Sequence, residues 1–379
     1  MRNPLTELSV EELRHRRSIK WRQYEPDVLP LWIAEMDTPL AEPIRAALAA
    51  AVARGDTGYA HPGRLREAFA AFCARRYGWS PDPAQMIVVP DVVRGLGEVL
   101  RVVSAPGDGV VINTPAYPPF FSVITAAGRR LVESPLRRGE DGTYRLDLGA
   151  LDRDLAADGV TVFVLCNPHN PTGVVLNTEE LAAVVEITRR HRVQLLSDEI
   201  HAPLTYPSYR HVPVAPLAPE AIVFSSASKA WNLPGLKAAL VVAGGDAAWQ
   251  VLSRLPIEVT FGVALPGVLA GEAAFDEGEE WLAALMRGLD DNRRLLAELL
   301  AAKLPGVGYV PPQATYLAWL DLRPLGLGDS PGEVLLERAR LALSDGPGFG
   351  DAGRGFARLN FATSPSILAE AVDRIASVR

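Results

Sequence analysis

The chain has 379 residues, of which 48% are hydrophobic and 22% charged. This length and composition permit a large buried core and predict two or three domains. A net charge of −7 with scattered basic residues argues against a nucleic-acid-binding surface, and no apolar stretch reaches the ~20 residues that a membrane span needs.

The N-terminus carries arginines but no apolar core before a cleavage site, so we expect no signal peptide and a cytoplasmic protein. Cys73 and Cys166 cannot form a disulfide framework, which agrees with a reducing compartment. The histidines show no metal-ligand spacing, and we expect no metal site.

Short apolar runs alternate with helix-like segments from about residue 86 to residue 245. They lack polar alternation, as do the strands of a parallel sheet that is covered on both faces. This succession predicts a three-layer α/β/α domain with a mainly parallel sheet. The expected strands are 86–90, 109–115, 161–165, 193–197, 221–225 and 238–244.

One crossover helix is marked at both ends. Asn177 or Thr178 would cap it, acidic residues follow in its first turn, and residues 189–191 are basic, which suits the helix dipole. The residues expected on its inner face are Leu181, Val184, Val185 and Thr188.

After Phe275 the pattern changes to that of a smaller α+β unit, against which the N-terminal segment is expected to pack. We expect a large domain over 45–275 and a small domain made of 1–44 and 276–379. The elements expected in the small unit are a long helix over 278–306, strands over 315–322 and 356–362, a helix near 332–343 and a last helix from Ser366.

Three of the expected strands are followed by chemically active side chains. Asn170 lies in the loop after the expected strand 161–165. Asp198 directly follows the expected strand 193–197, and Lys229 follows the expected strand 221–225. Ligands of open α/β sheets bind outside the carboxyl ends of the strands, so these side chains are expected to converge. A lysine in a shielded pocket has a lowered pKa and can form a Schiff base. Taken singly, Lys229 could be a solvated rim residue and Asn170 a simple loop former.

Motifs along the whole chain, taken in order, resemble those of pyridoxal-phosphate enzymes of the aspartate-aminotransferase fold (fold type I). Within that group the chain resembles the MalY/PatB-type cystathionine β-lyases. The motifs are LWIAEMD (31–37), TGYAHP (57–62), PAYPPF (115–120), CNPHNPTGVV (166–175), SDEIHAPL (197–204), SASKAWNLPGLK (226–237) and RLNFATS (358–364).

The resemblance implies roles around a pyridoxal 5'-phosphate cofactor. Lys229 would hold the cofactor covalently and move the Cα proton of the substrate. Asp198 would face the pyridine nitrogen and keep it protonated, which supports the electron-sink role of the ring. Asn170 would donate to the phenolic oxygen, and the Asn170–Pro171 bond is a candidate cis peptide.

Two further cofactor contacts are open to more than one interpretation. Tyr117 resembles the aromatic residue that stacks on the pyridine ring, although a Pro-Tyr-Pro-Pro loop could equally use the ring for packing. His201 stands where aminotransferases usually carry a tyrosine, and it could tune the cofactor or fill space.

The cofactor's phosphate is expected at the start of the helix that follows Pro90, since free N–H groups and the helix dipole favour an anion. Asp91 is expected to cap that helix with its side chain turned away from the phosphate. By resemblance, Tyr59 would reach the phosphate from a partner subunit, which implies a homodimer with a shared active site. The other expected phosphate ligands are Val92, Val93, Ser226, Ser228 and Lys237.

On the substrate side, Arg358 is expected to bind the α-carboxylate, since a guanidinium matches a carboxylate bidentately. Arg340 and Arg354 are expected to be ordinary surface residues. Trp32 and Ala34 are expected near the substrate.

The favoured function is α,β-elimination from cystathionine or a related cysteine S-conjugate. An aminotransferase is the main alternative, because it would use the same residues up to removal of the Cα proton. A regulatory protein that keeps the cofactor fold is a further possibility. A nicotinamide-dependent dehydrogenase is disfavoured, because no GxGxxG motif follows the first strand.

Overall fold

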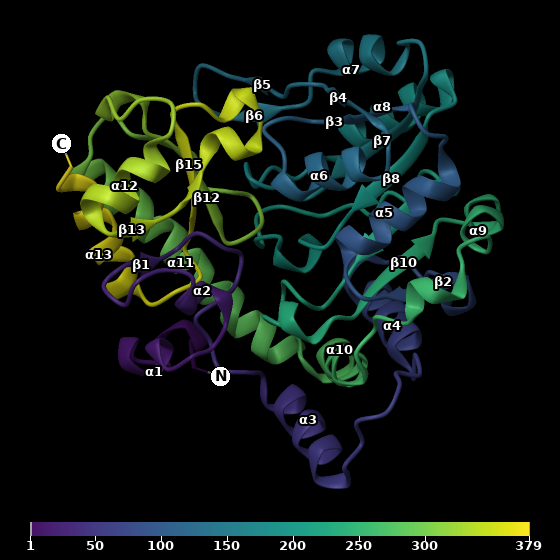
Figure 1. Cartoon of the computed structure of the whole chain (residues 1–379), viewed down its shortest axis with the longest axis horizontal. Helices are drawn as coiled ribbons and strands as arrows, with labels where there is room; N and C mark the ends of the chain where they lie inside the picture. Colours follow the sequence, from purple (N-terminus) through teal and green to yellow (C-terminus); the bar gives the residue numbers. More distant parts are fainter. Residues whose placement is uncertain (1, 379) are drawn as a thin grey trace.

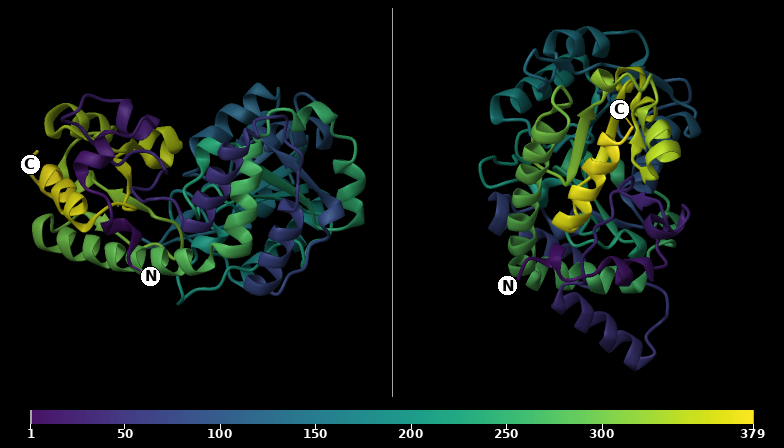
Figure 2. Two further views of the ribbon diagram at one scale, coloured as in Figure 1. Left: turned by 90° about the horizontal axis from the view of Figure 1, so that it is seen from below. Right: turned by 90° about the vertical axis from the view of Figure 1, so that its left-hand side faces the viewer.

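The computed structural model describes residues 2–378. It has a larger unit built on a seven-stranded sheet and a smaller unit built on a four-stranded sheet. In Figure 1 the larger unit is mostly blue and teal, and the smaller unit is yellow, green and purple. The chain's two ends both belong to the smaller unit's side of the molecule (Figure 2).

The large sheet has the strand order β2-β10-β9-β8-β7-β3-β4. The pairs among β3, β4, β7, β8 and β9 are all parallel, which confirms the mainly parallel sheet. The strands are β2 (Met86–Val89), β3 (Gly109–Ile112), β4 (Arg130–Glu133), β7 (Val160–Cys166), β8 (Gln194–Asp198), β9 (Ile222–Ser225) and β10 (Ala239–Ala243).

Two features of this sheet differ from the expectation. β10 runs antiparallel to both β9 and β2, because the segment between β9 and β10 contains no crossover α-helix that could return the chain to the same end. β4 was not expected as a strand at all. Its residues are exposed or half-buried at the sheet edge, so it lacks the continuous apolar run of a central strand.

Helices cover both faces of the sheet. One face carries a core with side chains from α5, α6 and α9, and the other carries α4, α7, α8 and α10, which confirms the three-layer arrangement. The helices outside the small unit are α3 (Glu42–Arg54), α4 (Leu65–Tyr77), α5 (Val92–Val103), α6 (Pro118–Ala126), α7 (Leu148–Leu155), α8 (Thr178–His191), α9 (Asp246–Leu252) and α10 (Leu265–Glu277).

The crossover helix α8 forms for the reasons visible in its sequence. Asn177 is the cap, since its side chain accepts a hydrogen bond from the backbone of Glu180 while the Glu180 side chain accepts one from the backbone of Asn177. The expected inner face is buried against the sheet. The helix stops at Arg192, whose φ of 56° is left-handed.

The smaller unit has the strand order β11-β12-β15-β14. Its central strands are antiparallel, with Trp319 opposite Arg358. The expected helix near 332–343 is shorter than predicted, because Arg340 takes a left-handed φ of 53° and the chain continues as β13. The elements are α11 (Glu279–Lys303), β11 (Gly308–Tyr309), β12 (Leu317–Asp321), α12 (Pro331–Ala339), β13 (Leu341–Ala342), β14 (Ser344–Asp345), β15 (Phe356–Asn360) and α13 (Pro365–Ala376).

The N-terminal segment packs against this smaller unit, as expected. Strand β1 (Leu29–Pro30) pairs in parallel with β13, and the backbone N–H of Asn360 donates to Leu31 O. Two short helices precede it, α1 (Val10–Arg14) and α2 (Ile19–Arg22). A small hairpin of β5 (Arg137–Arg138) and β6 (Tyr144–Arg145) lies between the sheet's β4 and α7 in sequence.

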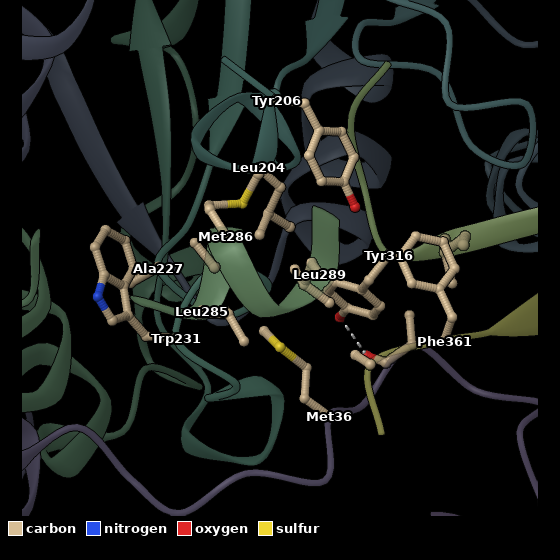
Figure 3. Packing of buried hydrophobic residues seen from close by; sticks show 14 of the residues in the cluster. Met36, Leu204, Tyr206, Ala227, Trp231, Leu285, Met286, Leu289, Tyr316 and Phe361 are labelled. Carbon is tan, nitrogen blue, oxygen red and sulfur yellow. Dashed lines mark hydrogen bonds between the residues drawn. The ribbon is translucent and has the colours of Figure 1, made fainter. Parts of the chain in front are cut away.

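Helix α11 joins the two units, and Figure 2 (left) shows it running along the underside of the smaller unit towards the larger one. Its buried side chains lie among residues from the N-terminal segment, from the loop after β9, from the segment after β8 and from the small sheet (Figure 3). No helix within residues 2–378 is both long enough and apolar enough to cross a bilayer. The division at residues 45 and 275 stays a prediction.

Candidate active site

A cavity of about 370 Å³ lies where β7, β8 and β9 end at their carboxyl termini. Asn170, Asp198 and Lys229 all line it, so the three strand-end residues converge as the topology suggested. The complete lining is Ala34, Pro90, Asp91, Val92, Val93, Tyr117, Pro119, Cys166, Asn170, Asp198, Ile200, His201, Ser226, Ser228, Lys229, Pro234, Lys237 and Ala238.

Lys229 follows β9 and is held by the N-terminal segment. Its Nζ donates to Ala34 O at 3.2 Å, and the Tyr316 hydroxyl donates to the same oxygen at 3.0 Å. Burial lowers the pKa of Lys229 to about 8, with the nearby Arg358 cation acting in the same direction and Asp198 against it. The amine can therefore lose its proton close to neutral pH.

Asp198 is the last residue of β8, and its Oδ1 accepts a hydrogen bond from the backbone N–H of Ile200 at 3.1 Å. Burial raises the pKa of Asp198 to about 7, against the opposing effects of that hydrogen bond and of the Lys229 cation. A bound cation beside this carboxylate would therefore favour its ionised form.

The neighbouring Glu199 anchors the end of β8 from within the protein. Its carboxylate accepts hydrogen bonds from the Ser197 hydroxyl at 3.0 Å and from the Val214 backbone at 3.0 Å, and it pairs with His211 Nε2 at 3.0 Å. Glu199 and the His211 side chain are buried. These contacts fix the turn from which Asp198 enters the cavity.

Asn170 and Arg358 are joined by a direct hydrogen bond. Arg358 Nη1 donates to Asn170 Oδ1 at 2.9 Å. The Asn170 side chain can donate to a ligand through its amide nitrogen. Arg358 Nη2 donates to Trp32 O at 3.2 Å and to Ser344 Oγ at 3.1 Å. The Asn170–Pro171 peptide bond is cis, as the sequence suggested.

Arg358 lies beside the cavity, outside its lining. It is buried, and its Nε has no hydrogen-bond partner among the described residues. Burial lowers the pKa of Arg358 to about 10, so the guanidinium stays charged at neutral pH. A buried guanidinium matches a carboxylate in chemical type.

Tyr117 and His201 both line the cavity. Tyr117 lies at the start of α6 and packs edge-on against Phe120 at 5.6 Å between ring centroids. His201 is buried, and its Nδ1 has no hydrogen-bond partner within residues 2–378. Burial lowers the pKa of His201 to about 3, and the Lys229 and Arg358 cations add to this effect. The ring is therefore neutral.

The α5 side of the cavity contains the residues expected to bind phosphate. The backbone N–H groups of Val92 and Val93 precede the first hydrogen bond within α5. Ser228 and Lys237 also line the cavity. The Ser226 hydroxyl already donates to Ala238 O at 2.8 Å and accepts from Ser228 N at 3.0 Å, so it holds the loop in place.

Asp91 caps α5 as expected, since its Oδ1 accepts from the Arg94 N–H at 2.8 Å. The expectation that its side chain turns away is wrong. Asp91 lines the cavity, and its Oδ2 forms an ion pair with Lys237 Nζ at 3.1 Å. The attraction between the two opposite charges keeps the carboxylate at this side of the cavity.

Other candidate residues lie elsewhere. Tyr59 is fully exposed and does not line the cavity, and Trp32 contributes its carbonyl to Arg358 while its side chain lies outside the lining. Arg340 pairs with an aspartate on the surface, and so does Arg354, as expected of surface residues.

The remaining lining residues escaped the sequence reasoning as cavity residues. Most of them are apolar and adjoin a residue that was identified, as Ile200 adjoins Asp198 and Cys166 begins the loop of Asn170. Burial raises the pKa of the Cys166 thiol well above its ordinary value, so the thiol is inert. Position next to a strand end was the available signal.

The residues of this cavity fit pyridoxal phosphate. A buried lysine with a lowered pKa, the buried carboxylate of Asp198 and the amide of Asn170 line one cavity with the start of α5. These groups match an aldehyde, a pyridine nitrogen, a ring oxygen and a phosphate in chemical type. Among the described residues, no group of three or more metal-binding side chains is placed to hold a metal ion.

Comparison with known proteins agrees with this chemistry. The family model for aminotransferase class I and II matches residues 6–375. A Mycobacterium leprae protein provisionally named cystathionine beta-lyase is 45% identical, over 98% of this chain and 97% of that protein. The cystathionine beta-lyase of Corynebacterium glutamicum is 37% identical over 97% and 98%. The solved structure of the PLP-bound C-S lyase from Staphylococcus hominis superposes with a TM-score of 0.91, at 27% identity over 98% and 97% of the two chains.

Proposed function

Because this chain belongs to the aminotransferase class I and II family, we propose that it is a pyridoxal-phosphate-dependent C–S β-lyase. It cleaves cystathionine or a related cysteine S-conjugate to a thiol, pyruvate and ammonia. The observation that carries the proposal is the meeting of Asn170, Asp198 and Lys229 in one cavity. The similarity to cystathionine β-lyases over nearly the full chain supports it.

When bound, the cofactor supplies the electron sink that makes the Cα proton of an amino acid acidic. In this proposal Lys229 anchors the cofactor, Asp198 faces its ring nitrogen, and Asn170 donates its amide N–H to the ring oxygen. Tyr117 covers one face of the ring. His201, neutral and in the cavity lining, would border the cofactor.

Lys229 is the group that moves protons. Once the substrate's amino group has displaced Lys229 from the cofactor, the amine, whose pKa is lowered to about 8 chiefly by burial, would accept the substrate's Cα proton near neutral pH. The Ala34 carbonyl accepts a hydrogen bond from Nζ at 3.2 Å and limits where the amine can lie. The overall reaction would consume one water molecule and release the thiol, pyruvate and ammonia.

Arg358 binds the α-carboxylate of the substrate. Its charge is held in place by Asn170, Trp32 and Ser344, so little side-chain freedom is lost when the carboxylate arrives. The N-terminal segment that carries Trp32 and Ala34 borders the substrate. The backbone N–H groups of Val92 and Val93, together with Ser228 and Lys237, would hold the phosphate, while Ser226 supports the loop.

The principal alternative is an aminotransferase. The same lysine, carboxylate and arginine serve both reactions until the Cα proton has been removed, and the chain's family includes aminotransferases by name. The two functions differ in whether a keto acid is needed as amino acceptor. A regulatory protein that keeps the cofactor fold would bind the cofactor and turn over neither substrate.

The test incubates the purified protein and pyridoxal phosphate with cystathionine and measures pyruvate and free thiol without any keto acid. The lyase forms both products without an acceptor, whereas strict dependence on a keto acid would establish the aminotransferase. Lys229→Ala should lose the visible absorbance of the lysine-bound cofactor and the activity. Lys303→Ala, which changes an exposed lysine paired with Asp373, is the matched control and should retain both.

We also propose that the protein works in the cytoplasm as a homodimer whose active sites are shared. Tyr59 is fully exposed on one chain, which suits a residue that reaches the phosphate of a second copy. The large domain would span 45–275, and the small domain would combine 1–44 with 276–379.

A further inference from the structure

The charges on the α5 side of the cavity cancel each other. Apart from Asp198 and Lys229, the charged residues in the cavity lining are Asp91 and Lys237. They form an ion pair of 3.1 Å between Oδ2 and Nζ, with 40% of the Asp91 side chain and 52% of the Lys237 side chain exposed. A phosphate arriving here meets a cation that already has an anion beside it.

Asp91 cannot leave easily, because both of its carboxylate oxygens are used. While Oδ2 contacts Lys237, Oδ1 accepts the Arg94 N–H at 2.8 Å and caps α5. The carboxylate therefore stays at the helix start, where the N–H groups of Val92 and Val93 attract an anion.

Resting on the proposed function, we propose that Asp91 competes with the cofactor's phosphate for Lys237 and so weakens cofactor binding. The carboxylate acts as an internal substitute anion in the cofactor-free protein. Phosphate binding must then weaken the contact between Asp91 and Lys237 and place two anions near one ammonium group. Like charges so placed repel each other, although solvent screens much of the effect at this exposure.

Asp91 is not needed to place Lys237. The backbone of Lys237 is fixed independently, with a left-handed φ of 54° and a carbonyl that accepts the N–H of Ala264 at 3.0 Å. Its side chain can therefore reach the cavity without the aspartate. For this reason we expect loss of the carboxylate charge to strengthen phosphate binding.

The decisive variant is Asp91→Asn, which removes the charge and keeps an N-cap of similar strength. Cofactor-free protein is titrated with pyridoxal phosphate, and the dissociation constant is read from the absorbance of the bound cofactor. We expect a dissociation constant about threefold to fivefold lower than that of the wild-type protein. The change is this small because a half-exposed ion pair contributes little free energy. Inorganic phosphate, used as a competitor, should also bind more tightly to the variant.

The matched control is Asp147→Asn. Asp147 caps α7 in the same way, accepting from the Ala150 N–H at 2.9 Å, and it does not line the cavity. This variant should bind pyridoxal phosphate and inorganic phosphate like the wild-type protein. Thermal unfolding of the two cofactor-free variants checks that both caps are kept.

Lys237→Gln tests whether the effect acts through the lysine. In that background Asp91→Asn should improve cofactor binding by less than half as much as in the wild-type protein, and an undiminished improvement would refute competition for Lys237. An unchanged or higher dissociation constant for Asp91→Asn alone would overturn the inference while leaving the proposed function intact. Absence of saturable binding to the wild-type protein would overturn the proposed function together with this inference.

Discussion

Lys229 is a buried lysine that lines the cavity. Burial lowers the pKa of Lys229 to about 8, so its unprotonated, reactive fraction rises as the pH passes through about 8. In the cofactor-free protein we expect acylation of Lys229 to reach half its limiting rate near pH 8. Lys303, on the surface, serves as the internal comparison, and mass spectrometry locates the modification. Identical pH dependence at the two lysines would contradict this prediction.

Asp198 is expected to separate cofactor binding from chemistry. In Asp198→Asn the side chain keeps its size, but it no longer supplies the negative charge that keeps the ring nitrogen protonated. We expect the variant to retain the visible absorbance of the lysine-bound cofactor while kcat for pyruvate release falls about 100-fold or more. A variant that keeps more than a tenth of wild-type kcat would show that the carboxylate charge is dispensable.

At the scale of elements, the N-terminal segment depends on a buried ion pair. Lys20 Nζ lies 2.8 Å from Asp37 Oδ2, with both side chains fully buried, and Lys20 also donates to Glu35 O at 3.1 Å. The Trp21 ring N–H donates to the same aspartate at 2.9 Å. These contacts hold the stretch that contains Ala34, whose carbonyl accepts from Lys229.

We therefore expect Lys20→Met to lower the free energy of unfolding by about 3–5 kcal/mol, because it leaves the Asp37 charge buried without its partner. The double variant Lys20→Met/Asp37→Asn should recover much of that loss, since no unpaired charge remains and the amide oxygen can still accept from Trp21. Denaturant unfolding of the cofactor-free proteins measures the free energy of unfolding of the single and the double variant. Equal stability of the single variant and the wild-type protein would mean that the pair contributes nothing.

The elements that could be predicted from sequence are those whose burial leaves a continuous pattern. The central strands are short runs of mainly apolar residues, and α8 has a cap, a charge gradient and an apolar face. The end of α12 has no such signal, because its left-handed residue is Arg340 instead of a glycine. The direction of β10 depends on the connection before it, which composition does not reveal.

Within the site, too, the residues that could be predicted are those that a sequence pattern marks. Asn170, Asp198 and Lys229 could be identified because each follows a recognisable strand, and sheet topology then brings them together. The contact between Asp91 and Lys237 joins residues 146 positions apart and depends on side-chain orientation, so no local pattern marks it. The use of the Ser226 hydroxyl within its own loop was hidden for the same reason.

At the scale of the whole molecule, large apolar side chains are exposed on α3 and in the segment that leads into α10. Figure 1 shows α3 at the lower edge of the molecule, with its C-terminal end farthest from the sheets. On α3, Val52 is 77% exposed, and in the segment that leads into α10, Ile257 and Phe261 are 66% and 69% exposed. Helix α3 packs on α10, and the segment with Ile257 and Phe261 precedes α10 in the chain. Tyr59 follows α3 in the chain.

We expect a second copy of the chain to cover the exposed side chains of Val52, Ile257 and Phe261. Sedimentation velocity should give a dimer for the wild-type protein, and Ile257→Asp/Phe261→Asp should give a monomer, because burying two carboxylates against an apolar partner is unfavourable. Val310→Asp, at a half-exposed position on the smaller unit, is the control and should remain dimeric. If Tyr59 reaches the partner's phosphate, the monomeric variant and Tyr59→Phe should both bind pyridoxal phosphate more weakly. A wild-type monomer with full lyase activity at micromolar concentration would exclude a shared active site.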